Sequence, residues 1–347
     1  MSRYYYKNLT KDNQAIYLSI FQCCKPVSPS VRLPLTDTNA LAEIFTLLKL
    51  DEPSLFYVTA YKYRYTQGAD HIEFSPEYIF EKSKIPSHIN AIDTRIKRLI
   101  EPVRGASELE KIKYIHDFLC ASVTYDKLKK NYSHEVIGPL SHGIGVCEGI
   151  AKTAKLLCDA LGIECIVVLC ENDPEHGIKY RHAWNIVNTG GKYYHMDATF
   201  DNTLCKCGEI RYDYLLLDDS RIFRDHLPSI WHVPQCSDSG GLYYKTAKLS
   251  FTRPEEISKR IESALRKKKN SFVFHWRGGY LNREILIKIL SLCSEKAAAK
   301  GKFVSASVNF PQAVVCLKFG DIAVEPIVAE EANESVTGGE SISTDLS

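Results

Sequence analysis

The segment from 181 to 199, RHAWNIVNTGGKYYHMDAT, most narrows the folds open to this chain. Two alternating runs joined by NTGG predict an antiparallel β-hairpin. If the turn is centred on the Thr–Gly pair of NTGG, His182 pairs directly with Asp197, and opposed residues on one sheet face have Cβ atoms about 4.5–5.5 Å apart. A three- or five-residue loop would place the two side chains on opposite faces. The hairpin therefore predicts a His–Asp pair that depends on its register.

A cysteine precedes this hairpin at the start of a predicted helix. The segment GVCEGIAKTAKLLCDALG (145–162) has apolar residues at helical spacing and ends in Gly162, which suits a left-handed C-cap. Cys147 stands at the helix N-terminus, where unpaired N–H groups and the helix dipole favour the reactive thiolate. We expect Gly145 and Gly149 to leave room for a substrate backbone near the sulfur.

A purely structural role is the main alternative for these residues. The chain has 12 cysteines, several of them inside apolar segments, and buried thiols behave as small hydrophobes. A His–Asp pair can likewise be a surface contact without a task. A cysteine at a helix start followed by such a pair favours catalysis, because the carboxylate orients the imidazole and the imidazole can accept the thiol proton.

The motifs GVCEG, RHAWNIV and YHMDATFDNT, in this order, resemble those of the transglutaminase-like superfamily. The resemblance covers about 107–235 and includes RYDYLLLDDSRIFRDH, which is similar to a segment of bacterial members. It implies an α+β, papain-like core in which a helix carrying the cysteine packs on an antiparallel sheet carrying the histidine and the aspartate.

The same resemblance assigns roles to individual residues. Cys147 would be the nucleophile, His182 the general base and acid, and Asp197 the orienting residue. The backbone N–H of Cys147 would be one oxyanion donor, and Tyr125 is a candidate for the second. Trp184 would form one wall of the cleft, with core packing as the alternative.

Changes in pattern along the chain predict four regions. They are a mixed α/β N-terminal region at 1–100, the catalytic core at 101–235, a small α+β unit at 236–324 and a disordered acidic tail at 325–347. Helices are expected near 13–24, 38–50, 107–120, 147–161, 252–270 and 283–300, and strands near 57–65, 163–170 and 271–276. Ser107 with Glu110 predicts a capping box, and Thr252 with Glu255 predicts another helix cap.

Composition and charge argue against several classes of function. The chain has 44 basic and 42 acidic residues, a balance that argues against nucleic acid or anionic lipid as a partner. The first residues lack an apolar run long enough for a signal peptide or a membrane span, so a cytoplasmic protein is expected. No cofactor and no metal are expected; zinc at His195, Cys205 and Cys207 is a minor alternative, because the pattern offers no fourth ligand.

The sequence thus predicts a cysteine-dependent amide-bond enzyme that forms a thioester with a protein or peptide substrate. Hydrolysis, by a peptidase or deamidase, is favoured because water needs no second recognition site. Transfer of the acyl group to an amine, as in a transglutaminase, is one alternative. A binding module that keeps the fold without the reaction is the other.

Overall fold

The computed structural model describes residues 2–173, 175, 181–205 and 209–321. The predicted tail at 325–347 and Cys207 lie outside these residues. The chain divides into two compact units, one of Met1–Asn172 with Arg181–Thr246 and one of Asp173–Tyr180 with Ala247–Ser347. This division differs from the boundaries expected at 100 and 235.

Within the part of the chain that the structure describes, the first unit contains most of the helices and three sheets. Its α-helices are α1 (Tyr4–Asn8), α2 (Lys11–Cys24), α3 (Thr38–Asp51), α4 (Ile85–Ile100), α5 (Glu108–Ser122), α6 (Cys147–Ala160), α7 (Ala198–Leu204), α8 (Asp219–Ile222) and α9 (Tyr243–Thr246). Its strands are β1 (Val31–Pro34), β2 (Val58–Tyr65), β3 (His71–Tyr78), β4 (Thr124–Tyr125), β5 (Ile144–Gly145), β6 (Cys165–Cys170), β7 (His182–Thr189), β8 (Lys192–Met196) and β9 (Leu215–Leu217). They form sheets in the orders β1-β3-β2, β4-β5 and β6-β7-β8-β9.

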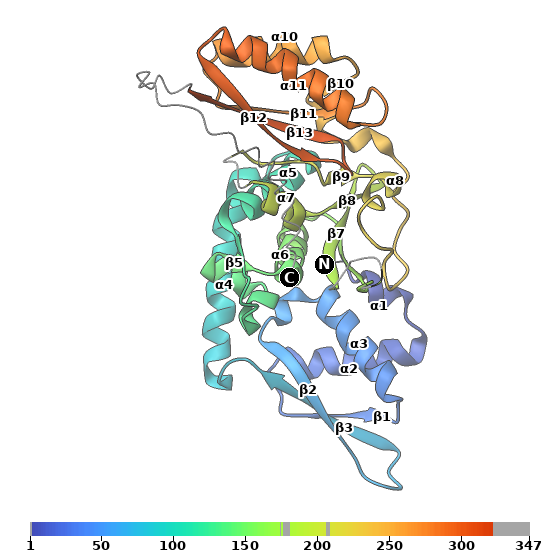
Figure 1. The fold of residues 1–347 in the computed structure, drawn as a ribbon. Coiled ribbons are helices and arrows are strands. Elements are labelled where there is room, and N and C mark those ends of the chain that lie inside the picture. The colour runs from blue at the N-terminus through green and yellow to red at the C-terminus, as the bar shows by residue number, and fades with distance from the viewer. Residues whose placement is uncertain (1, 174, 176–180, 206–208, 322–347) are drawn as a thin grey trace, which may run out of the picture. The chain divides into compact units, whose positions relative to one another are not determined.

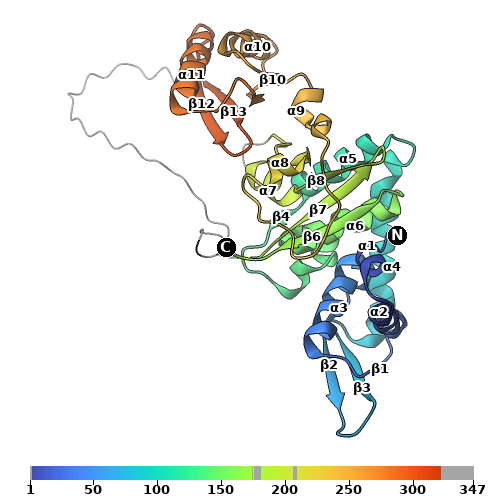
Figure 2. The same ribbon diagram turned by 90° about the vertical axis from the view of Figure 1, so that its right-hand side faces the viewer.

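Helix α6 and the antiparallel sheet β6-β7-β8-β9 form the centre of this unit, and α6 lies along β6 and β7 (Figures 1 and 2). Strand β6 is buried along its whole length, as its apolar sequence predicts. On α6, Ile150, Ala154 and Leu157 share a core with Val187 and Met196 of the sheet. The predicted α+β core, with a helix carrying the cysteine on an antiparallel sheet, is confirmed.

Local sequence signals account for the ends of the helices around the site. Ser107 and Glu110 form the predicted capping box of α5. At the other end of α6, Gly162 adopts φ +75°, and the N–H of Ile163 bonds the carbonyl of Cys158 at 2.9 Å. This bonding closes the helix as expected for a left-handed glycine cap.

The N-terminal region packs into the same core as the central sheet rather than standing apart from it. Ile16 and Tyr17 of α2 belong to one apolar cluster with Leu157 of α6. The Asp51 carboxylate accepts the backbone N–H groups of Tyr5 and Tyr6 at 3.2 and 2.9 Å, which fixes α1 beside α3. The first hundred residues are therefore part of the unit that carries the site.

In the described residues of the second unit there are two helices and one sheet in the order β10-β11-β13-β12. Its elements are β10 (Ser250–Phe251), α10 (Pro254–Arg266), β11 (Ser271–Trp276), α11 (Arg283–Ala298), β12 (Lys302–Asn309) and β13 (Val314–Asp321). The cap predicted at Thr252 is wrong: α10 begins at Pro254, and among the described residues no side chain caps its first turn. Proline suits this position because its missing N–H would be unpaired anyway. None of the helices in the described part of the chain is long and apolar enough to cross a membrane.

Candidate active site

The β7–β8 hairpin turns one residue later than predicted. Thr189 pairs with Lys192, and Gly190 and Gly191 adopt φ +60° and +76°, as a two-residue turn with left-handed backbone requires. The predicted direct pairing of His182 with Asp197 is therefore wrong by two residues of register. Because the side chains of a strand alternate with a period of two, the shift leaves both residues on the same face.

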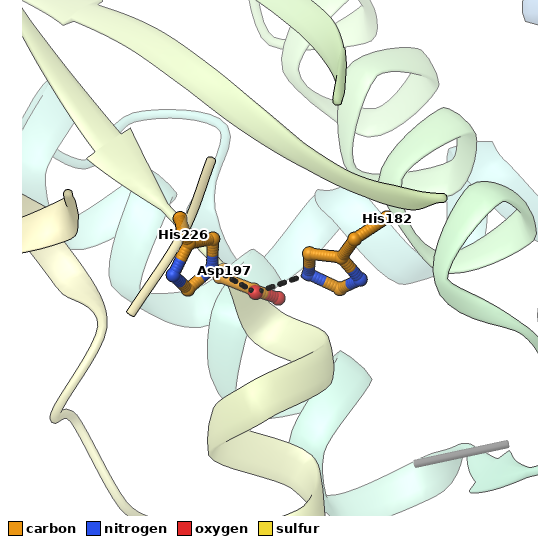
Figure 3. A group of neighbouring side chains, drawn as sticks. All are labelled: His182, Asp197 and His226. Carbon is orange, nitrogen blue, oxygen red and sulfur yellow. Dashed lines mark hydrogen bonds and ion pairs between the residues drawn. The ribbon is translucent and has the colours of Figure 1, made fainter. Parts of the chain in front are cut away.

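His182 begins β7, and Asp197 directly follows β8 as the N-cap of α7. Nε2 of His182 donates to Oδ2 of Asp197 over 2.6 Å (Figure 3). Burial disfavours the charged imidazole, but the Asp197 carboxylate outweighs it and raises the pKa of His182 well above its usual value. Burial opposes ionisation of Asp197 too, yet His182 and His226 hold its pKa well below the usual range. The pair is therefore an imidazolium and a carboxylate near neutral pH.

Cys147 is the first residue of α6 and is half-buried. Its side chain hydrogen-bonds His182. Since Nε2 of His182 is bound to Asp197, the other ring nitrogen is the one available to the thiol. The structure thus brings the three predicted residues together in the order Cys147, His182, Asp197.

Tyr125 reaches the same place through the short sheet β4-β5. Tyr125 pairs with Gly145 in a parallel register, and the N–H of Asp126 bonds the Gly145 carbonyl at 3.0 Å. The Tyr125 phenol oxygen accepts the backbone N–H of Cys147, and burial raises the pKa of Tyr125 to about 12. The phenol is therefore protonated at neutral pH and can donate its own hydrogen beside the Cys147 amide.

Trp184 lies in the core and does not line an open cleft. Its side chain is only 1% exposed, and its ring stacks on His182 with 5.9 Å between centroids. Its Nε1 donates to Nδ1 of His195 at 3.0 Å. Trp184 therefore supports the His182 imidazole from within the core.

The two glycines that flank Cys147 serve the packing of the protein's own chain. A Cβ at Gly149 would lie 2.1 Å from the carbonyl oxygen of Ser133, and a Cβ at Gly145 would lie 2.9 Å from the Pro139 side chain. The expectation that these glycines leave room for a substrate is wrong. They let the segment around Ser133 press against the start of α6.

His226 was missed by the motif reasoning. It is buried, and its Nε2 bonds the same oxygen of Asp197 that binds His182, at 2.9 Å (Figure 3). Its Nδ1 bonds Oδ1 of Asp225 at 2.8 Å. The one sequence signal was the resemblance of RYDYLLLDDSRIFRDH to a bacterial segment, because no periodicity connects His226 with Asp197.

Two trios of side chains have ligand atoms within 4.8 Å of one another and could hold a metal. Among the described residues these are His182, Asp197 and His226, and His195, Asp219 and Cys236. In the first trio, both Nε2 atoms are hydrogen-bonded to one oxygen. In the second, Nε2 of His195 bonds Asp219 at 2.8 Å and Nδ1 accepts the indole N–H. Both ring nitrogens of His195 are thus hydrogen-bonded to other side chains of the protein, in the positions that a metal would need.

The residues of the minor zinc alternative, His195 and Cys205, have different hydrogen-bond partners. His195 bonds Asp219 and Trp184, whereas Cys205 hydrogen-bonds Cys120. Cys207 lies outside the described residues. The contacts seen therefore give no support to a site built on His195 and Cys205.

Residues 97–198 match the model of the transglutaminase-like superfamily. This segment contains Cys147, His182 and Asp197 and is similar to the superfamily, whose members are commonly cysteine enzymes. Among curated proteins, none matches the chain at a significant level.

Several solved structures are similar to the chain at low identity. One is a TGase (16% identity, TM-score 0.28), which aligns over 49% of this chain and 51% of its own. A candidate cysteine protease from Cytophaga hutchinsonii (16%, 0.27) aligns over 41% and 62%, and menin (16%, 0.26) over 60% and 52%. The chain thus spans about half to three fifths of the length of these structures.

Proposed function

We propose that the protein is a cysteine-dependent amide-bond enzyme in which Cys147, His182 and Asp197 act as a triad on a protein or peptide substrate. The observation that carries the proposal is the position of His182. Its Nε2 bonds Asp197, and its other ring nitrogen is available to the Cys147 side chain, which hydrogen-bonds the imidazole. An imidazole held between a thiol and a carboxylate can accept the thiol proton and later return it.

The first half of the reaction forms a thioester. In the resting pair His182 already holds the proton of Cys147, and the Sγ thiolate attacks the carbonyl carbon of a side-chain or peptide amide. The backbone N–H of Cys147 donates to the phenol oxygen of Tyr125. When the substrate oxygen replaces this contact, the N–H and the protonated phenol can both donate to the developing oxyanion. The C–N bond then breaks, and His182 returns its proton to the leaving nitrogen, which departs as ammonia or an amine.

The second half releases the acyl group. Water gives a proton to His182 and attacks the thioester carbon, the C–S bond breaks, and the proton passes to the sulfur. An amine in place of water would give a new amide. We favour hydrolysis because it requires no acceptor site besides the triad.

The test is to trap the acyl-enzyme. The protein is incubated with a mixture of glutamine-containing peptides, quenched in acid and digested, and Cys147 is examined for a bound acyl group by mass spectrometry. The mass of the released peptide separates hydrolysis from transfer, because water converts the glutamine to glutamate whereas an added primary amine forms a substituted glutamine; ammonia is released in both cases. We expect an adduct in the wild type and none in Cys147→Ala.

A non-catalytic binding module is the second candidate. The same experiment distinguishes it from the enzyme. If the wild type and Cys147→Ala both retain peptides while no adduct and no ammonia form, the protein binds substrate-like chains without reacting with them. Retention in Cys147→Ala together with an adduct only in the wild type supports the enzyme.

A further inference from the structure

We propose that His226 is a positioning residue that holds Asp197 and balances its charge, so that His182 can release its proton to the leaving group. The inference rests on the proposed function of the triad. Its starting point is that one carboxylate oxygen serves two imidazoles, with Oδ2 of Asp197 lying 2.6 Å from Nε2 of His182 and 2.9 Å from Nε2 of His226 (Figure 3).

Both oxygens of the Asp197 carboxylate accept two hydrogen bonds. Its other oxygen, Oδ1, accepts the backbone N–H groups of Thr199 and Phe200 at 2.8 and 3.1 Å. Without His226, Oδ2 would keep one of its two imidazole partners, and the carboxylate would have a buried lone pair unpaired. Since an unpaired buried acceptor is costly, His226 completes the hydrogen bonding of Asp197.

His226 is itself fixed at its far end. Nδ1 bonds Oδ1 of Asp225 at 2.8 Å, and the other Asp225 oxygen accepts the Tyr214 hydroxyl at 2.6 Å. The backbone carbonyl of Tyr214 accepts the N–H of Asp197 at 3.0 Å. The contacts form a closed loop from Asp197 through His226, Asp225 and Tyr214, and the loop keeps the imidazole from rotating.

The hydrogen bonds of His226 make it a cation. Both of its ring nitrogens face a carboxylate, and an imidazole that donates from both nitrogens is protonated. Burial lowers the pKa of His226 and the neighbouring His182 lowers it too, but the bonds to Asp197 and Asp225 raise it overall.

Among the described residues, both titratable and aromatic side chains face His226. The titratable groups that face it are Asp197, Asp225, His182, His195 and Tyr214, and the rings of Trp184 and Phe200 complete its neighbourhood. The ring centroids of His226 and His182 are 5.4 Å apart. A second cation at this distance weakens the hold of Asp197 on the His182 proton, which a general acid must give up during the reaction.

The test compares variants by the pH dependence of Cys147 alkylation with iodoacetamide, mapped by mass spectrometry, which needs no substrate. His226→Gln keeps a donor for Asp197 but removes the charge, and Asp225→Asn keeps a partner for Tyr214 while removing the anion that charges His226. His71→Gln is the matched control, since His71 also pairs with an aspartate, Asp70, at 2.9 Å but lies in another sheet.

We expect both His226→Gln and Asp225→Asn to move the inflection that reports His182 upward by about one pH unit, because a like charge nearby has been removed. The control should leave it unchanged. A folded His226→Gln with the wild-type inflection and rate overturns the inference. If wild-type Cys147 shows no reactivity at pH 6 beyond that of an ordinary thiol, the triad itself fails, which is a different result.

A second measurement covers the case in which both variants fail to fold. Nitrogen-15 NMR of histidine-labelled wild-type protein reports the protonation of each ring nitrogen. His116 is also charged at pH 7, because Asp117 and Asp201 outweigh its burial and raise its pKa to about 9. At pH 7 we therefore expect one further buried histidine, besides His182 and His116, with both nitrogens protonated and hydrogen-bonded. Neutral rings throughout, apart from His182 and His116, contradict the charge assigned to His226.

Discussion

Replacing Gly149 with alanine should damage stability and catalysis together. The new Cβ would lie 2.1 Å from the carbonyl oxygen of Ser133 and 3.3 Å from that of Glu135. Backbone atoms cannot rotate away from a clash as a side chain can, so either α6 or the segment around Ser133 must move. The same Ser133 oxygen accepts the N–H of Val146 at 3.1 Å, one residue before Cys147, so the movement reaches the nucleophile.

The size of the effect follows from these contacts. Overpacking costs about 1–3 kcal/mol, and a backbone clash belongs at the upper end of that range. Losing the Val146 hydrogen bond adds about 1 kcal/mol. The two costs total about 4 kcal/mol, so at roughly 2–4 °C per kcal/mol for a unit of this size the melting temperature should fall by roughly 8–16 °C. A displacement of about 1 Å at Cys147 can reduce turnover by about 100-fold.

The assays are thermal unfolding, the rate of Cys147 alkylation and peptide turnover, with Gly105→Ala as the matched control. A Cβ at Gly105 meets no atom within 4 Å, so this variant should behave like the wild type. If Gly149→Ala keeps wild-type stability and only its KM for peptides rises, the glycine serves the substrate and the packing explanation is refuted.

Other changes test single contacts. Asp197→Asn should lower kcat by about 10²–10⁴-fold with a smaller effect on KM, because the amide cannot stabilise the imidazolium; an unchanged kcat contradicts the role of Asp197. Tyr125→Phe should lower kcat by about 10²–10³-fold if the phenol donates to the oxyanion, and a loss confined to KM argues for a binding role instead. His116 is buried, and although burial opposes its charge, Asp117 and Asp201 raise its pKa to about 9. Its stabilising contribution is complete below pH 6.5 and is lost as the pH rises toward 9, so urea unfolding should show a steeper loss in the wild type than in His116→Gln over this range. Equal slopes contradict the charge assigned to His116.

The sequence was sufficient for the parts of the site that rest on local periodicity. The alternation of the β7–β8 hairpin placed His182 and Asp197 on one face, and this result survived an error of two residues because the period of a strand is two. The start of α6 at Cys147 followed from helical spacing and a terminal glycine, both of which are local signals.

The parts that the sequence could not supply depend on contacts between distant segments. Gly149 fits against Ser133, and His226 reaches Asp197 from a segment 29 residues later; neither contact leaves a periodic trace. The alternation of β7 shows on which face of the sheet Trp184 lies. It does not show whether other elements cover that face, so the burial of Trp184 could not be predicted. The packing of the N-terminal region into the core likewise depends on tertiary contacts. One example is the pair of hydrogen bonds that Asp51 accepts from the backbone of Tyr5 and Tyr6.

The central claim is that His182 and the start of α6 activate Cys147. The most direct measurement is the rate of iodoacetamide labelling at pH 6, resolved by mass spectrometry for each cysteine and compared with the same peptides in the unfolded protein. The triad predicts that folded Cys147 reacts faster than unfolded Cys147 and that His182→Ala removes the difference. Labelling of folded Cys147 that is no faster than in the unfolded chain, or unaffected by His182→Ala, would contradict the claim.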